Sequence, residues 1–401
     1  MVPIDGIEQL RHLIRTHPLI DNHCHNLLSA RHAANYDKYA FECIASDAGA
    51  TALSQTASKT LPYARAVKQL AQLYDCAPDW QEIKRVRKER IQEDYEGLVR
   101  QCLLGTQSLL LDDLLTDDGV EPFQWHNRFS RSPSRRIVRI ESVAAHTIGQ
   151  FADCREGIAF QGVYPAVLVG MSHFSNHFDN AIMSAIADPA VVGFKSVICY
   201  RTGLDVDLMV ESDATTQSYA KVACASGHRI DDKPLNDWLV LRVLDLLREA
   251  QKEQGIVKPL QFHTGLGDPD LDLLRANPAH LQAVIEAYPE VSFVLLHSSY
   301  PYTQQAGYLA CSYPNVYLDL GEVFPMVSRD GQERILRQAF ELTPTSRLLW
   351  STDGHFFPET YWLSNKQFRE VLEKVYDPVY SSLISLLIHI IKGARGIRDR
   401  G

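Results

Sequence analysis

The sequence Ile20-Asp21-Asn22-His23-Cys24-His25 ends the first apolar run of the chain. The residues before it, Pro18-Leu19-Ile20, are typical of a short buried strand. Residues two apart in a strand point to the same side, so we expect His23 and His25 to project together from its carboxyl end. Two imidazoles on one rigid face can provide half of a metal site, because Zn²⁺ takes neutral imidazole nitrogens at ~2.0–2.1 Å.

Seven further strands are expected along the chain, and they alternate with helical stretches. The strands are expected at residues 108–111, 135–141, 191–198, 259–263, 291–297, 316–320 and 347–353, and helices at 5–16, 143–190, 235–253, 279–287 and from the eighth strand to the C-terminus. Such alternation predicts a parallel sheet, and eight strands predict a closed (β/α)₈ barrel of the TIM type. No linker rich in proline, glycine or serine divides the chain, so we expect one domain over residues 1–401.

Residues 26–105 contain no strand-like run, and their second half is helical in pattern. We expect a mainly helical insertion after the first strand, where it is well placed to form a lid. Its basic run, Lys84 to Arg90, is interpreted as a solvated helix face because the chain as a whole is acidic.

The composition is that of a soluble enzyme. The 401 residues are 45% hydrophobic, enough for a large core, and the net charge of −9 argues against nucleic acid as a partner. Eight scattered cysteines without a Cys-x-x-Cys pair indicate reduced thiols. The N-terminus has no signal-peptide pattern, and the longest apolar run, Ile384 to Ile391, is far below the ~20 residues of a membrane span. We therefore expect a cytoplasmic protein, and a homo-oligomer is compatible with the sequence.

Metal-type side chains stand at the ends of four predicted strands. His23 and His25 end the first, His263 the fifth, His297 the sixth and Asp353 the eighth. In a (β/α)₈ barrel all these ends converge on one face. Taken singly, His263 and His297 could be core histidines and Asp353 a helix N-cap. Their coincidence at one barrel mouth favours a metal site, whereas His126 and His146 lack such support and are expected at the surface or rim.

This arrangement resembles the amidohydrolase superfamily, which has His-x-His on strand one, histidines on strands five and six, and aspartate on strand eight. Several segments resemble the N-terminal amidohydrolase region of the FluG-type developmental proteins of fungi, in the amidohydrolase-2 branch, namely Gly193–Ser196, Tyr200–Leu204, Phe262–Gly265, Leu296–Pro301 and Ser351–Gly354. That branch is related to metal-dependent decarboxylases and more distantly to uronate isomerases. In FluG-type proteins a glutamine-synthetase-like domain follows, and because this sequence ends at Gly401 we expect that domain to be absent.

The resemblance implies a role for each of the five residues. His23, His25 and Asp353 would hold the more buried metal, and His263 would be a further ligand. His297 would be either a ligand of a second metal or a hydrogen-bonding electrophile for the substrate. Asp353 would also be the general base, because zinc lowers the pKa of bound water to ~7 and a carboxylate beside that water can accept its proton. One or two Zn²⁺ ions are expected, with another divalent metal such as Mn²⁺ as the alternative.

Three further residues are candidates with open alternatives. Lys195 lies on the fourth strand, where many amidohydrolases carry a lysine carboxylated by CO₂ that bridges two metals. It lies six residues before Arg201, however, so it could instead bind a carboxylate or substrate, or form a structural ion pair. Arg201 is suited to bidentate binding of a substrate carboxylate, with a rim salt bridge as the alternative. Tyr300 either contacts the substrate or packs the loop.

Two weaker expectations complete the site. Cys24 should face away from the metal and carry no chemistry. Asp319 and Glu322, at the end of the seventh strand, are candidates to contact a metal-bound histidine.

The leading interpretation is a metal-dependent hydrolase that cleaves a C–N bond of a small carboxylate-bearing molecule. The domain fused to FluG-type relatives makes γ-glutamyl amides attractive substrates, by family analogy only. The nearest alternative is a non-oxidative decarboxylase in which Asp353 relays a proton. Asp21, two places before the histidine pair, slightly favours that branch. A catalytically silent regulatory protein on the same fold is the third reading, and the presence of every metal-type residue argues against it.

Overall fold

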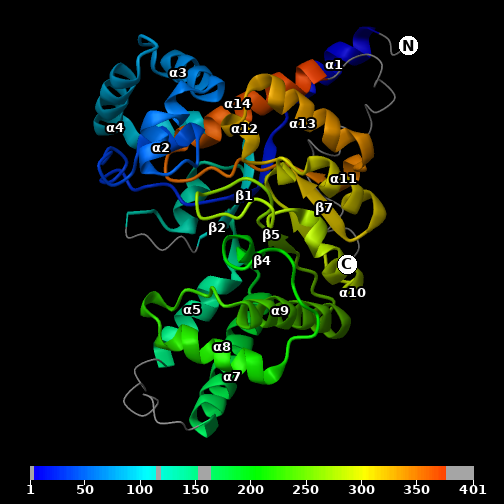
Figure 1. Ribbon diagram of the computed structural model, residues 1–401. Coiled ribbons are helices and arrows are strands. Elements are labelled where there is room, and N and C mark those ends of the chain that lie inside the picture. The colour runs from blue at the N-terminus through cyan, green and yellow to red at the C-terminus, as the bar shows by residue number, and fades with distance from the viewer. Residues whose placement is uncertain (1–3, 114–118, 152–163, 376–401) are drawn as a thin grey trace.

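The computed structural model describes residues 4–113, 119–151 and 164–375 of the chain (Figure 1). Within these ranges, eight parallel strands form one sheet in chain order. The strands are β1 (Leu19–Cys24), β2 (Thr106–Asp112), β3 (Arg135–Arg139), β4 (Val191–Ser196), β5 (Leu260–Phe262), β6 (Phe293–Leu295), β7 (Val316–Asp319) and β8 (Leu348–Leu349). The eight predicted strands are therefore confirmed, and with them the TIM-type barrel.

The first and last strands are joined by backbone hydrogen bonds, which nearly close the barrel. The amide of Asn22 donates to the carbonyl of Trp350 at 2.9 Å, and the amide of Asp353 donates to the carbonyl of His23 at 3.1 Å. The Asp21 carboxylate reinforces this seam, because it accepts hydrogen bonds from both the amide and the hydroxyl of Thr352. The two histidines at the end of β1 and the aspartate after β8 are consequently neighbours.

Most strands are shorter than predicted, since the chain leaves the sheet early at the barrel mouth. Residues 140 and 141, predicted in the third strand, instead begin helix α5. The fourth strand ends at Ser196, and a 3-10 turn covers Ile198–Tyr200. At the mouth the backbone of His297 and Asp353 has positive φ angles of 67° and 50°. These turns direct side chains across the mouth, and a hydrophobicity pattern does not reveal them.

Helices cover the outside of the barrel in two groups (Figure 1). The first group is α5 (Ile140–Phe151), α7 (Tyr164–Ala187), α8 (Ser212–Cys224) and α9 (Lys233–Gln254), and the second is α1 (Ile4–Thr16), α10 (Gln282–Ala287), α11 (Thr303–Ser312), α12 (Val323–Met326), α13 (Arg329–Leu342) and α14 (Pro358–Val375). The predicted helices near residues 5–16, 235–253 and 279–287 are confirmed. Residues 152–163 of the predicted helical stretch, and the apolar run Ile384 to Ile391, lie outside the described residues.

Apolar faces of these helices pack on the sheet and form the main core, with Phe174, Phe178, Leu239, Val243 and Phe262 fully buried. Helix α9 ends where Gly255 adopts a left-handed φ of 68°, a conformation that glycine takes without steric cost. No helix in the described ranges is long and apolar enough to cross a membrane.

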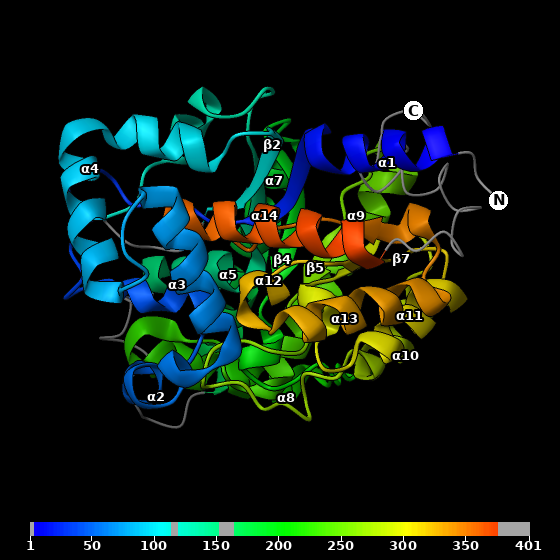
Figure 2. The same ribbon diagram turned by 90° about the horizontal axis from the view of Figure 1, so that it is seen from above.

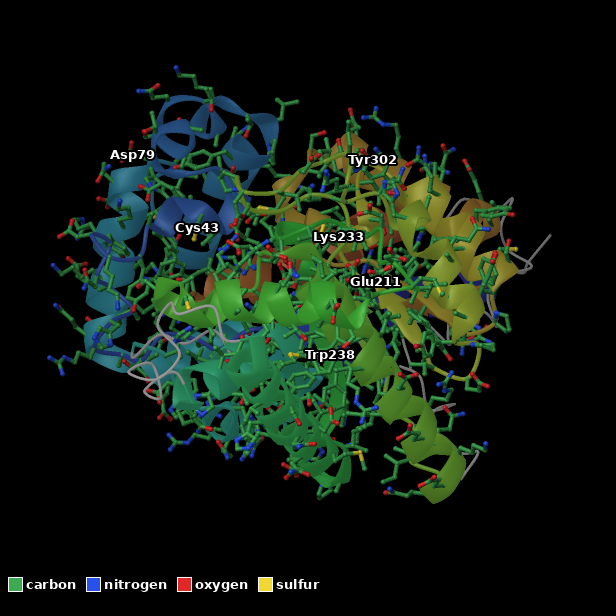
Figure 3. The ribbon with its side chains drawn as sticks, turned by 60° about the horizontal axis from the view of Figure 1, so that its bottom comes forward. Cys43, Asp79, Glu211, Lys233, Trp238 and Tyr302 are labelled. Carbon is green, nitrogen blue, oxygen red and sulfur yellow. The ribbon has the colours of Figure 1, made fainter. Side chains whose placement is uncertain are left out.

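The segment after β1 is helical, as predicted. It contains α2 (Ala50–Gln55), α3 (Leu61–Tyr74) and α4 (Trp80–Cys102). Helix α4 begins after Asp79, labelled in Figure 3, whose carboxylate accepts hydrogen bonds from the amides of Gln81 and Glu82. The inserted helices share a second hydrophobic cluster with β2 and the first turns of α14. Figure 2 shows α14 between α1 and α13, with α3 and α4 beside its amino-terminal end.

The prediction that the basic run of α4 is a solvated face is wrong for its central residue. Arg87 is fully buried, and its Nε lies 2.6 Å from Oε1 of Glu359, which is also fully buried in the first turn of α14. Arg87 also donates to the carbonyl of Ala33, and Tyr74 donates to Glu359. Burial alone would lower the pKa of Arg87, but the adjacent Glu359 carboxylate outweighs it and raises that pKa. This ion pair attaches the insertion to the barrel.

Removing one charge of this pair should destabilise the protein strongly. Glu359→Gln leaves the Arg87 guanidinium buried without a counter-charge, so we expect a loss of about 3–5 kcal/mol in the free energy of unfolding, measured by urea denaturation. The matched control is Glu82→Gln, which breaks an exposed pair with Arg85 on the same helix and should change stability little. Equal effects of the two substitutions would contradict the structural role of the buried pair.

Candidate metal centre

The structure brings together all five residues predicted at the strand ends. His23 lies on β1 and His25 directly after it, while His263, His297 and Asp353 follow β5, β6 and β8. The four histidines are at most 6% exposed. The five side chains form one buried cluster at the carboxyl end of the barrel, where (β/α)₈ enzymes carry their active sites.

Asp353 lies at the centre of this cluster. Its Oδ1 is 3.3 Å from Nε2 of His23 and 3.2 Å from Nε2 of His25. This oxygen is buried and has no hydrogen-bond partner. A buried polar atom without a partner is costly, and a cation between the two imidazoles and the carboxylate would satisfy it. The residues therefore fit a divalent metal ion.

The Nδ1 atoms of His23 and His25, which face away from Asp353, each have a hydrogen-bond partner. Nδ1 of His23 donates to Oε1 of Gln261 at 2.9 Å, because the amide group of Gln261 donates to Asn22 and leaves its oxygen as the acceptor. Nδ1 of His25 lies 3.1 Å from the carbonyl oxygen of Asp112. These contacts leave Nε2 of each ring facing Asp353, as is usual for metal-binding histidines.

His23, His263 and His297 are neutral, which is the state that a metal requires. Burial lowers the pKa of His23 to about 3 and that of His297 to about 4. Burial and the neighbouring His297 lower the pKa of His263 well below its usual value. All three rings can therefore offer a lone pair near neutral pH.

A second group of donors adjoins the first, since His297 belongs to both. Donor atoms of His263, His297 and Glu322 all lie within 4.8 Å of one another. Nδ1 of His297 is 3.0 Å from Oε2 of Glu322, yet neither ring nitrogen of this fully buried histidine has a hydrogen-bond partner. Glu322 was only a weak candidate from its position after the seventh strand. Its backbone φ of 61° accompanies a side chain that faces the cluster.

Lys195 joins the cluster and does not lie too deep in the barrel. Its Nζ is 2.8 Å from Nε2 of His23 and 3.9 Å from Oδ2 of Asp112. Burial lowers the pKa of Lys195, although the Asp112 carboxylate opposes that effect. Asp112 in turn receives two hydrogen bonds from Arg139. The sequence analysis did not single out Asp112, although it ends the second strand just as the metal-type residues end theirs.

The insertion also reaches the mouth, through residues that the sequence analysis missed. The carboxyl groups of Asp47 and Glu322 are close enough to share a proton, and burial raises the pKa of both. Sγ of Cys43, labelled in Figure 3, lies 3.8 Å from Nε2 of His355, two residues after Asp353. No sequence signal could have found Asp47, since it lies in an irregular segment and approaches the site only through tertiary packing.

The other candidates lie at the edge of the site. The side chain of Arg201 is 18% exposed, and its Nη1 is 3.8 Å from Oδ2 of Asp270. Tyr300 packs against the main core. The tyrosine that contacts the His263 ring is Tyr200, and the centroids of the two rings are 4.3 Å apart.

Two residues outside the site can also be placed. Cys24 faces the inserted helices, as expected. His126 is not a surface residue, contrary to expectation: it is fully buried, and its Nε2 accepts a hydrogen bond from the amide of Leu27.

Comparisons with known proteins agree with this architecture. The amidohydrolase family model matches residues 252–377. The protein FluG of Emericella nidulans is 57% identical over 383 residues, which cover 92% of this chain and 43% of FluG. This chain thus spans less than half the length of that relative.

Solved structures share the fold at low sequence identity. A Lactobacillus casei protein assigned as a metal-dependent hydrolase, without a named substrate, superposes with a TM-score of 0.76 at 23% identity over 98% of each chain. The uronate isomerase of Bacillus halodurans gives a TM-score of 0.60 at 13% identity, covering 94% of this chain and 89% of its own.

The eight-stranded barrel, the family match and the similarity to FluG agree, and the chain therefore belongs to the amidohydrolase superfamily as a FluG-like member.

Proposed function

We propose that this protein is a metal-dependent hydrolase that cleaves a C–N bond of a small carboxylate-bearing substrate, such as a γ-glutamyl amide. The observation that carries the proposal is the contact of one Asp353 oxygen with the inner nitrogens of two buried histidines, 3.3 and 3.2 Å away. In this proposal His23, His25 and Asp353 would hold one divalent ion, and His263 and His297, beside Glu322, would hold a second. Lys195, whose Nζ is 2.8 Å from Nε2 of His23, would be a further ligand if it is carboxylated. Bound Zn²⁺ or Mn²⁺ would supply a Lewis acid that polarises a carbonyl group and acidifies water.

Asp353 is the proposed general base. Burial would raise its pKa, but the neighbouring imidazoles of His297, His23 and His25 outweigh burial and hold that pKa well below its usual range. The carboxylate is therefore ionised near neutral pH and can accept a proton. The same group can return that proton to the departing nitrogen, since an amine leaves more easily when it is protonated.

The mouth has charges that suit an amino-acid-like substrate. The Arg201 guanidinium at the rim can bind a carboxylate through a bidentate pair of hydrogen bonds. The carboxyl groups of Asp47 and Glu322 can accept hydrogen bonds from an ammonium group. A γ-glutamyl amide carries both charges beside its amide bond. With Asp47 contributed by the insertion, we propose that residues 26–105 cover the bound substrate and exclude water from the reaction.

The decarboxylase alternative rests on the position of Asp21, which has a structural contact of its own in this protein. Asp21, which slightly favoured that branch, uses both carboxylate oxygens to bind Thr352 at the seam of the barrel. A lyase remains the alternative outcome of a substrate screen, recognised by release of CO₂ in place of ammonia or an amine.

Replacing the proposed base should abolish turnover while the fold survives. Asp353→Asn keeps an oxygen for the histidines but cannot accept a proton, so we expect amide hydrolysis to fall by about 10²- to 10⁴-fold. Release of ammonia or amine from a panel of γ-glutamyl and simple amides gives the rate, and elemental analysis gives the retained metal. Asp213→Asn, at an exposed position in the first turn of α8, is the matched control. Full activity of Asp353→Asn would exclude the mechanism.

Metal content should decide the state of Lys195. Protein purified without chelators is expected to hold about two metal ions per chain if Lys195 is carboxylated and bridges them. Lys195→Met should then lower the content to about one ion. About one ion in both proteins would instead make Lys195 a substrate-binding or ion-pair residue and strengthen the decarboxylase alternative. No metal, even after zinc is supplied, would contradict both enzymes.

Arg201 should affect substrate affinity more than the chemical step. For a carboxylate-bearing amide, Arg201→Met is expected to raise KM by about tenfold or more with a smaller change in kcat, because a charge-assisted hydrogen bond is lost in the ground state and transition state alike. An analogue without the carboxylate should be hydrolysed equally by both proteins. Equal losses with the two substrates would exclude carboxylate recognition by Arg201.

A further inference from the structure

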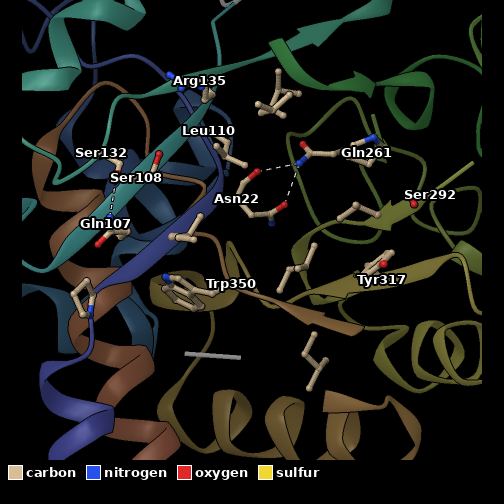
Figure 4. Close-up of a pocket in the computed structure, with 18 of the residues that line it drawn as sticks. Asn22, Gln107, Ser108, Leu110, Ser132, Arg135, Gln261, Ser292, Tyr317 and Trp350 are labelled. Carbon is tan, nitrogen blue, oxygen red and sulfur yellow. Dashed lines mark hydrogen bonds between the residues drawn. The ribbon is translucent and has the colours of Figure 1, made fainter. Parts of the chain in front are cut away.

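A cavity of about 770 Å³ lies inside the barrel, at the end opposite the metal centre (Figure 4). Residues from the amino-terminal halves of the strands line it, among them Ile20, Ser108, Arg135, Ser292 and Tyr317. Sites for small molecules in proteins typically occupy about 300–1,000 Å³ and are mainly apolar. The size and the largely apolar walls of this cavity are those of a ligand site.

The cavity exists because small side chains stand where large ones usually pack. The interior of a (β/α)₈ barrel is normally filled by layers of bulky branched residues. In this barrel Ser108 and Ser292 occupy inward positions near the open end. As a result Ile20 and Tyr317 remain partly exposed, although each lies within a strand whose neighbouring residues are buried.

A layer of amide side chains separates the cavity from the metal centre. Gln261 and Asn22 line the cavity and hydrogen-bond to each other, as the dashed lines of Figure 4 show. Asn22 also donates to Asp319 at 2.9 Å, and Gln261 accepts from His23 at 2.9 Å. The side chains of Asn22 and Gln261 thus already have hydrogen-bond partners. A ligand at the inner end of the cavity therefore needs no charged group.

The charge at the outer end is positive. Arg131 and Arg135 both line the cavity, and neither forms an ion pair with a carboxylate in the part of the chain that the structure describes. The side chain of Arg135 donates to the carbonyl of Ser134 at 3.3 Å. No aspartate or glutamate is among the described residues that line the cavity. In a protein with a net charge of −9, two arginines that have no carboxylate partner among the described residues and lie beside an apolar chamber are complementary to an anion.

We propose that this cavity binds a small amphipathic anion. Its apolar body, an aromatic ring system or a medium-length acyl chain, would fill the barrel interior, and its single carboxylate, sulfonate or phosphate group would pair with Arg131 and Arg135. The site is independent of the proposed hydrolase activity, since none of its wall residues belongs to the metal centre. An occupant would nevertheless contact Gln261, which orients His23.

The test uses two fluorescent probes with the same apolar body and the metal-loaded protein. 8-Anilino-1-naphthalenesulfonate carries one negative charge, and N-phenyl-1-naphthylamine carries none. For the double variant Arg131→Gln/Arg135→Gln we expect the Kd of the charged probe to rise by about tenfold or more, and that of the neutral probe to stay within about twofold. Arg85→Gln, on the exposed face of α4, is the control and should change neither.

A second substitution tests the location. Ser108→Trp should fill the cavity and weaken both probes, and Ser292→Leu serves the same purpose if the first variant does not keep the melting temperature and circular dichroism of the parent. Binding of the charged probe that is unaffected by the double arginine change would overturn the proposal. So would binding of both probes that survives a folded cavity-filling variant, because the probes would then occupy another surface.

Discussion

The contact of Asp353 with His23 and His25 is the interaction on which the rest of the site depends. It joins the last strand of the barrel to the first, where the backbone hydrogen bonds of Asn22 and Asp353 and the Asp21 carboxylate already form the seam. Closure of the barrel and the meeting of these three side chains are thus one event. A substitution that loosens this seam also moves the residues proposed to hold a metal.

At the buried carboxyl end of the barrel, neutral imidazoles lie beside ionised carboxylates. The imidazoles are neutral because burial lowers the pKa of His23 and His297. Asp112 is ionised because Arg139 contacts it, which holds its pKa below the usual value despite burial. Lys195 lies between these two environments, 2.8 Å from an imidazole and 3.9 Å from the Asp112 carboxylate. A cation placed here meets donors that are already oriented, so little reorganisation accompanies its binding.

The sequence predicted those parts of the molecule that follow from periodicity and strand ends. The eight strands and the meeting of His23, His25, His263, His297 and Asp353 follow from short apolar runs and from the geometry of parallel barrels. Burial of Arg87 could not be predicted, because its partner lies on a helix 272 residues later. The position of Asp47 and the cavity inside the barrel could not be predicted for the same reason, because each depends on which side chains meet in three dimensions.

The seam between the first and last strands also has a consequence for biosynthesis. Asp21 and Thr352 are 331 positions apart, and the metal ligands on either side of the seam are separated by a similar length of chain. At about 5–20 residues per second, the ribosome takes on the order of tens of seconds to make that stretch. During this time the first histidine pair has emerged without its aspartate. The proposed metal site can therefore be completed only after the eighth strand has left the ribosome.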